Sequence, residues 1–230
     1  MLGSVKPNNS VILIGSVTQP PKHDAGKKLV FVVGGTMESA GRATTFYHEV
    51  IVPGGRAADP LAEKLKVGDA VRVTGTLSES KWEKDGEKHS KMQIKSFDVD
   101  FLHREGEEDF ITDSAGGKRL ADASSWACII GFVGDAPKVK EGENKIARVR
   151  VAVSEMGAGT EGGEKEKITH WVNVVGFDDH AESLSATQKG DRLLVEGVLV
   201  SESWKTPEGK NRSTTSLKAT RIEYVIRKES

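Results

Sequence analysis

Apolar and polar residues alternate along many short segments of the chain, and glycines interrupt the alternation at regular intervals. Residues 71–77 are one example, with Val71, Val73 and Leu77 at positions that suit a buried face, and residues 193–199 repeat the arrangement. A period of two is typical of half-buried β-strands. The pattern therefore predicts a chain that is mainly β.

The same pattern occurs twice in the 230 residues. Residues 66–77, KVGDAVRVTGTL, are echoed by residues 188–199, QKGDRLLVEGVL. Five residues after each terminal leucine stands a tryptophan, Trp82 or Trp204, and a turn signature follows it. Residues 11–17 likewise match residues 127–133. A chain that repeats its own pattern in this way is predicted to contain one structural unit used twice.

Each copy is predicted to hold five strands and one short helix. The helices are expected near Asp59, read as an N-cap followed by Pro60, and near Asp179, which precedes Glu182 in capping-box spacing. Three strands, a helix and two more strands suit the five-stranded barrel of the OB-fold. We therefore expect an all-β protein with two tandem OB barrels, at residues 1–105 and 124–230.

Charge and composition mark the stretch between the copies. The net charge is −1, but residues 106–123 carry five acids against two bases and few periodic apolar residues, which predicts an acidic, Gly-rich linker. A phosphate-binding protein usually carries a basic excess, so any such function must rest on the local distribution of charge. Residues 1–105 carry 15 bases against 13 acids.

Several aromatic residues are predicted to face away from the barrel cores. Trp82 and Trp204 each follow a core leucine by five residues, and an odd separation places two residues on opposite faces of a regular strand. Tyr47 and Trp171 similarly precede an apolar valine by three residues. Lysines and arginines lie between these rings in sequence. The candidate nucleic-acid-binding residues are Tyr47, Lys81, Trp82, Lys84, Trp171, Phe177, Trp204, Lys205, Lys210 and Arg212.

Flat rings beside cations suit a flexible polyanion with unpaired bases. Each base has a π-face, and stacking contributes on the order of 1–3 kcal/mol per base without reading the sequence. Duplex DNA hides these faces, so the surface is predicted to prefer single strands. Two other interpretations remain open: the rings pack in the core or at a subunit interface, and the Lys-rich turns are ordinary solvated hairpins.

These residues resemble the bacterial single-stranded DNA-binding protein family, in its double-OB, homodimeric type. The opening residues 8–15 with Pro20, the segment Tyr47-His48-Glu49-Val50 and the turn that contains Lys81 and Trp82 carry the likeness. The second copy is similar through Trp171, Phe177 and Trp204. The resemblance implies single-stranded DNA as ligand and a dimer with four OB domains.

The chain also departs from the family pattern. Glu49 stands where the family usually has arginine, and Val172-Asn173 replaces a His-Arg pair. Phe177 has Pro53 opposite it in the first copy, so the second copy is expected to contribute more of the stacking. The family ends in an acidic-aromatic tip that recruits replication and repair proteins, and no such tip is seen at Ser230, which leaves open a variant without recruitment or a truncated chain.

Other functions lack the residues they need. No phosphate-loop motif, nucleophile elbow or metal-ligand spacing is present, so we expect no enzyme, cofactor or metal. No signal peptide or membrane span is recognised, which predicts a cytoplasmic, nucleoid-associated protein. The sequence thus predicts a sequence-tolerant binder of single-stranded DNA in replication, recombination and repair. The alternatives are an OB-fold interaction or assembly factor, and an RNA binder.

Overall fold

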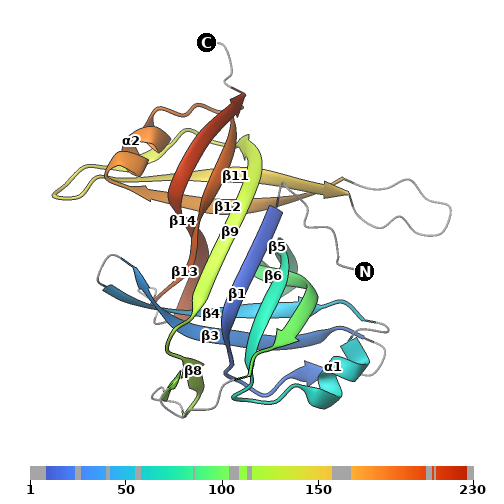
Figure 1. Ribbon diagram of the computed structural model, residues 1–230. Coiled ribbons are helices and arrows are strands. Elements are labelled where there is room, and N and C mark those ends of the chain that lie inside the picture. Colours follow the sequence, from blue (N-terminus) through green and yellow to red (C-terminus); the bar gives the residue numbers. More distant parts are fainter. Residues whose placement is uncertain are drawn as a thin grey trace. The chain divides into compact units, whose positions relative to one another are not determined.

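The computed structural model describes residues 9–23, 27–39, 42–54, 58–84, 86–103, 109–112, 116–156, 167–205, 209 and 211–226. These residues form two compact units (Figure 1). Unit 1 contains the described parts of Ser10–Trp126 and Val200–Thr214, and unit 2 contains Asn9 and the described parts of Ala127–Leu199 and Thr215–Ser230. Part of the second repeat therefore belongs to unit 1. The division predicted at residues 105 and 124 stays a prediction.

Unit 1 is built on a closed barrel of five strands. Its elements are β1 (Asn9–Val17), β3 (Leu29–Ser39), β4 (Arg42–Val52), α1 (Ala58–Lys64), β5 (Ala70–Lys84) and β6 (Glu87–Phe101). β1 pairs with β3 and β5, β3 with β4, and β5 with β6, all antiparallel. The parallel pairing of β4 with β6 closes the ring, with Val50 opposite Ile94.

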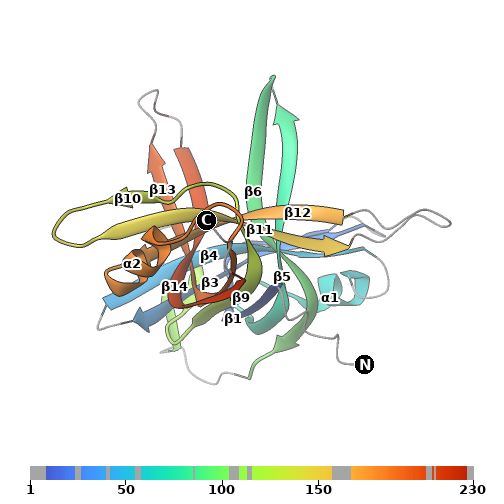
Figure 2. The same cartoon turned by 90° about the horizontal axis from the view of Figure 1, so that it is seen from above.

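Every second side chain of the strands points into this barrel and fills its core. Val11, Leu13 and Val17 on β1 are fully buried, as are Val73 and Leu77 on β5. Beyond the barrel, β5 and β6 continue as a long hairpin, which Figure 2 shows projecting from its own barrel. The short helix α1 lies within the connection between β4 and β5. It begins at Ala58, so Asp59 lies in its first turn and is not the N-cap that the sequence suggested.

Glycine lets the strands of both barrels approach each other closely. A Cβ atom on Gly75 would lie 2.5 Å from the Lys95 carbonyl oxygen, and one on Gly131 would lie 2.5 Å from the Ala152 carbonyl oxygen. These distances are too short for any side chain, so both positions require glycine. The register of β5 against β6 also shifts between Thr74 and Gly75, where the strand bends around the barrel.

The segment predicted as a linker contains ordered strands. β7 (Phe110–Thr112) pairs with β8 (Lys118–Leu120), and β8 pairs in parallel with β3 through Leu120 and Gly35. Leu120 is almost fully buried. The described residues of this segment thus pack on unit 1, and the interpretation of residues 106–123 as a linker stays a prediction. A further two-residue strand, β2 (Lys22–His23), pairs with β3.

Unit 2 repeats the barrel. The second barrel is formed by β9 (Ser124–Val133), β10 (Lys138–Lys140), β11 (Ile146–Met156), β12 (Lys167–Phe177), α2 (Asp179–Ser185), β13 (Arg192–Lys205) and β14 (Asn211–Ile226). The start of β9, the end of β13 and the start of β14 belong to unit 1. β9 pairs with β11, β11 with β12, and β12 in parallel with β14, whose other neighbour β13 returns to β9. Val174 pairs with Leu217 in β14, just as Val50 pairs with Ile94 in unit 1. Both barrels therefore have the OB topology, and the predicted fold class is confirmed.

The helix of unit 2 differs from expectation in its cap. α2 begins at Asp179, and its N-cap is Asp178, which has a φ of 50° and makes no side-chain capping hydrogen bond. The capping box expected from Asp179 and Glu182 is therefore wrong. The helix is instead held by packing, because Ala181 and Leu184 are fully buried.

Candidate nucleic-acid interface

The β5–β6 hairpin carries an exposed tryptophan. Trp82 pairs with His89 across the hairpin, and the two rings stack with centroids 5.5 Å apart and planes 16° from parallel. Trp82 is 44% exposed, whereas Leu77 on the same strand is fully buried. The Lys81 ammonium beside it lies 3.1 Å from Glu79. The histidine supports one face of the indole, so the exposed side is available to a planar ligand.

Tyr47 lies on the outer face of β4 in the same unit. It is 38% exposed and pairs with Gly34 of β3. The Ser201 hydroxyl of β13, which belongs to unit 1, donates a hydrogen bond to the Tyr47 carbonyl oxygen at 3.2 Å and lies 3.4 Å from Nδ1 of the buried His48. These contacts place the start of the β13–β14 hairpin, whose strand carries Trp204, beside the strand that carries Tyr47.

An acidic residue shares the outer face with Tyr47. Glu49 accepts a hydrogen bond from the Lys91 ammonium at 2.8 Å and another from the Gln93 amide. Partial burial by itself would raise the pKa of Glu49. The two hydrogen bonds and the charges of Lys91 and Lys28 together outweigh that effect, so the pKa is lowered. The departure at position 49 thus places a fixed negative charge on this surface and holds one lysine against it.

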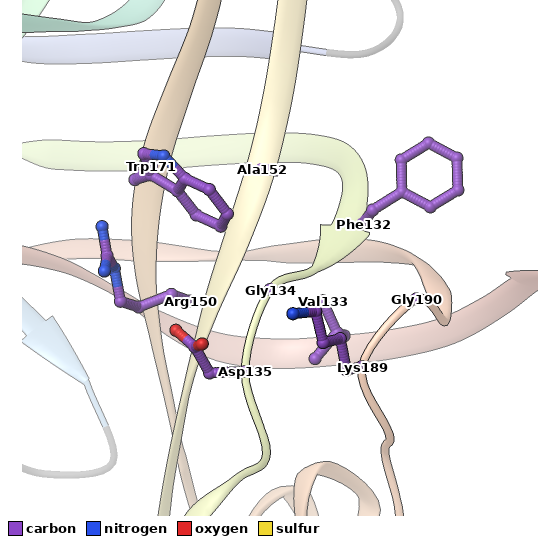
Figure 3. A pocket seen from close by; sticks show the side chains of 9 residues that line it. All are labelled: Phe132, Val133, Gly134, Asp135, Arg150, Ala152, Trp171, Lys189 and Gly190. Atoms are coloured by element: carbon purple, nitrogen blue, oxygen red, sulfur yellow. The ribbon is translucent and has the colours of Figure 1, made fainter.

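Unit 2 presents its own aromatic surface, shown in Figure 3. Trp171 lies on the outer face of β12, and the Arg150 guanidinium lies 4.8 Å from the centroid of its ring. A Cβ atom on Gly134 would overlap the indole, so the ring rests directly on the backbone there. An open pocket of about 510 Å³ adjoins Trp171 and reaches Phe132, Asp135 and Lys189.

Phe177 lies six residues further along β12, beneath the ammonium of Lys218, which is 5.2 Å from the ring centroid. Strand geometry separates Phe177 from Trp171 by about 20 Å, so the two rings are not brought together. The described residues thus place Trp82 and Tyr47 in unit 1, and Trp171 and Phe177 at two separate points of unit 2. Both Trp171 and Phe177 have a cation over the ring.

Several predicted residues lie partly or wholly outside the described part of the chain. The backbone of β5 includes Lys84, but its side chain is not described, and the same holds for Trp204 and Lys205 on β13 and Arg212 on β14. Lys210 is outside the described residues. Their roles stay predictions.

The sequence reasoning missed three residues of the unit 2 surface. Phe132 is 48% exposed, the Arg192 guanidinium lies 5.6 Å from its ring centroid, and Arg150 covers Trp171. A signal was present for each. Phe132 is three residues from the buried Ile129, Arg150 alternates with the buried Val149 and Val151, and Arg192 directly precedes the buried Leu193. Alternation along each of these three strands therefore points the side chains outward.

Both repeats of the chain match a known protein family. A model of the Single-strand binding protein family matches residues 8–102 and again residues 125–225. The chain belongs to the single-strand binding protein family. Its two repeats are thus two copies of the same family domain, which confirms the resemblance derived from the sequence.

Two relatives named as single-stranded DNA-binding proteins match this chain over nearly its whole length. The single-stranded DNA-binding protein of Deinococcus radiodurans is 30% identical over 231 residues, which cover 95% of this chain and 76% of that protein. The protein of the same name from Thermus aquaticus is 32% identical, with 95% and 85% covered. The crystal structure of the wild-type Thermus aquaticus protein superposes with a TM-score of 0.71 at 27% identity, over 96% of this chain and 95% of that one.

Two further observations concern the described residues alone. They include no group of three or more histidines, cysteines and acids placed to hold a metal ion. None of their helices has the length and apolar character needed to cross a membrane.

Proposed function

We propose that this protein binds single-stranded DNA without reading its sequence, through bases stacked on outward-facing rings and phosphates paired with lysine and arginine. The observation that carries the proposal is the match of both repeats to the single-strand binding protein family. The exposed faces of Trp82 and Tyr47, and the ring and cation pairs of unit 2, supply the chemistry it needs. The nucleic-acid contacts are assigned to the ten predicted residues.

The wider role follows from the same chemistry. A protein that covers exposed bases protects and straightens DNA during replication, recombination and repair. We place two copies of this chain in a homodimer, so that four OB domains share one strand. Partner enzymes would then be recruited to the covered strand. This role needs no catalytic group.

Competition among polynucleotides tests the proposal. A labelled oligodeoxythymidine bound to the protein is challenged with unlabelled oligodeoxythymidine, with RNA of matched length, and with duplex DNA. We expect the single DNA strand to displace the label at much lower concentration than the duplex, because the duplex hides the base faces. Equal displacement by the duplex would contradict the proposal. Stronger displacement by RNA would favour the alternative RNA-binding function, since stacking alone does not detect the 2′-hydroxyl.

The acidic residue on the Tyr47 face yields a prediction of its own. Glu49→Gln removes a negative charge and releases Lys91 for a phosphate. An exposed ion pair is worth up to about 1 kcal/mol, so we expect oligodeoxythymidine to bind about two- to fivefold more tightly at low salt. The slope of log K against log salt should steepen by about 0.7, which corresponds to one more phosphate contact on a single strand.

The matched control is Glu63→Gln, which removes a charge from an exposed position on α1. It should leave the affinity within twofold of the wild type. Because the pKa of Glu49 is lowered, its carboxylate stays charged at neutral pH, and the effect of Glu49→Gln should disappear only when the pH falls below that pKa. An unchanged or weaker affinity of Glu49→Gln at pH 7 would show that Glu49 does not restrain Lys91.

A further inference from the structure

One row of residues across three adjacent strands shapes the outer surface of unit 2. Phe132 of β9 pairs with Ala152 of β11, and Ala152 pairs in turn with Trp171 of β12. Residues paired directly across strands share a face, so both rings stand on the outer side with a small residue between them. Two strand spacings separate their backbones by about 10 Å. The row therefore has an aromatic wall on each side and an alanine floor.

The same row in unit 1 has a different composition. Ser16 of β1 pairs with Gly34 of β3, and Gly34 pairs with Tyr47 of β4. One wall is therefore a serine where unit 2 has Phe132. Ser16 is fully buried, and its hydroxyl donates a hydrogen bond to the Lys118 carbonyl oxygen of β8 at 2.8 Å. The β8 strand thus covers the position that stays open around Phe132.

In each unit the ring on the third strand of the row, Tyr47 or Trp171, packs against a glycine, and the position of that glycine differs between the units. In unit 1 the glycine is the floor residue, and a Cβ atom on Gly34 would lie 2.8 Å from Cδ1 of Tyr47. The tyrosine ring therefore lies over the floor and fills the row. The same Cβ atom would lie 2.6 Å from the Thr18 methyl group.

In unit 2 the glycine that contacts the ring lies at a different position of the row. Gly134 occupies the position of Thr18, two residues beyond the end residue of the row, and Trp171 rests on it. The floor residue is Ala152, whose methyl group leaves less room for a ring over the floor than Gly34 leaves in unit 1. The gap between Phe132 and Trp171 therefore remains open, and the pocket of about 510 Å³ lies there, with both rings and Ala152 in its lining (Figure 3).

The charges around this gap suit one kind of occupant. The guanidinium of Arg150 lies over Trp171 and that of Arg192 over Phe132, so each wall is joined to a cation. The pocket lining includes Lys189 as a further cation and Asp135 as an acid. A flat, neutral group with an anion attached to it matches two aromatic walls with outer cations, and an unpaired nucleotide has this form.

We propose that Phe132 and Trp171 form a slot that receives one unpaired nucleobase, with Arg150 and Arg192 contacting the adjacent phosphates. The corresponding row of unit 1, formed by Ser16, Gly34 and Tyr47, has a ring on one side alone and so forms no such slot. The proposal rests on the proposed function, because it assigns a base to a site on the same surface. It adds Phe132, which has no aromatic counterpart in the first repeat, as a binding residue.

Photocrosslinking locates the bases directly. Oligodeoxythymidine that contains 5-iododeoxyuridine is bound to the full chain, irradiated and digested, and the crosslinked peptides are identified by mass spectrometry. We expect crosslinks within residues 127–134 and none at residues 11–18, the matching segment of unit 1. Crosslinks to the Trp82 hairpin or to Tyr47 without any in residues 127–134 would overturn the slot but leave the proposed function intact. A wild-type protein that does not bind the oligonucleotide would refute both.

A pair of phenylalanine variants gives the energetic test. Phe132→Ala should lower the affinity for oligodeoxythymidine about fivefold or more, which corresponds to the loss of one stacked base. The control is Phe101→Ala, at the end of β6 away from the hairpin turn, because Phe101 is 47% exposed against 48% for Phe132. The control should stay within twofold of the wild type. Equal affinities of the two variants would overturn the slot, and so would a Phe132→Ala loss that accompanies a change of oligomeric mass in sedimentation.

Discussion

Trp171→Ala lowers the affinity for oligodeoxythymidine by about fivefold to 150-fold, which is the expected cost of losing a stacked base worth about 1–3 kcal/mol. Trp171 forms one wall of the slot and also orients Arg150, whose guanidinium lies 4.8 Å from its ring centroid. Removal of the indole therefore takes away a stacking surface and releases a cation from its position. Equilibrium titration at fixed salt measures the effect.

The control for this variant keeps an aromatic ring. Trp171→Phe should retain most of the affinity, because a smaller ring still stacks on a base. Thermal unfolding of both variants separates binding from folding, since the indole also packs on Gly134. A folded Trp171→Ala protein with an affinity within twofold of the wild type would contradict the assignment of Trp171 to the interface.

A fourfold rise in salt, from about 50 to 200 mM, should weaken binding at least about 100-fold. Five cations of the interface were predicted from the sequence, Lys81, Lys84, Lys205, Lys210 and Arg212, and single strands give a slope of about −0.7 for each phosphate neutralised, or about −3.5 for these five. Arg150 and Arg192 of the proposed slot would make the slope steeper. The chain has a net charge of −1, so this dependence must come from local contacts and not from overall attraction. Titrations at several salt concentrations give the slope directly.

A combined variant locates these contacts. Lys205→Ala, Lys210→Ala and Arg212→Ala together remove three cations of the β13–β14 hairpin, and the slope should fall in magnitude by about 2. Replacement of Lys138 and Lys140, two exposed lysines on β10, is the control and should leave the slope unchanged. A wild-type slope between 0 and −1 would show that phosphate contacts contribute little.

The repeat and the strand pattern could be predicted from the sequence because both are local. Alternation in residues 71–77 and 193–199 marks strands wherever they pair, and the fold of both barrels follows from their order. The exposure of Trp82 also follows from its odd separation from Leu77. Local periodicity was sufficient for these features.

Features that depend on the pairing of strands far apart in the sequence could not be predicted. The acidic composition of residues 106–123 is typical of a linker, but Leu120 pairs with Gly35, some 85 positions earlier in the chain. The open row in unit 2 depends equally on register, because only the pairing of Ala152 with both Phe132 and Trp171 brings the two rings to one floor. The second repeat is expected to contribute more of the stacking, and this row gives a physical reason for that expectation.

Tryptophan fluorescence during titration with oligodeoxythymidine tests the central claim most directly. Trp82 is exposed and Trp171 borders an open pocket, so bases that stack on them should quench the emission. We predict saturable quenching whose affinity falls as salt is raised. Emission that does not change with oligodeoxythymidine, together with no salt-sensitive affinity, would contradict the account.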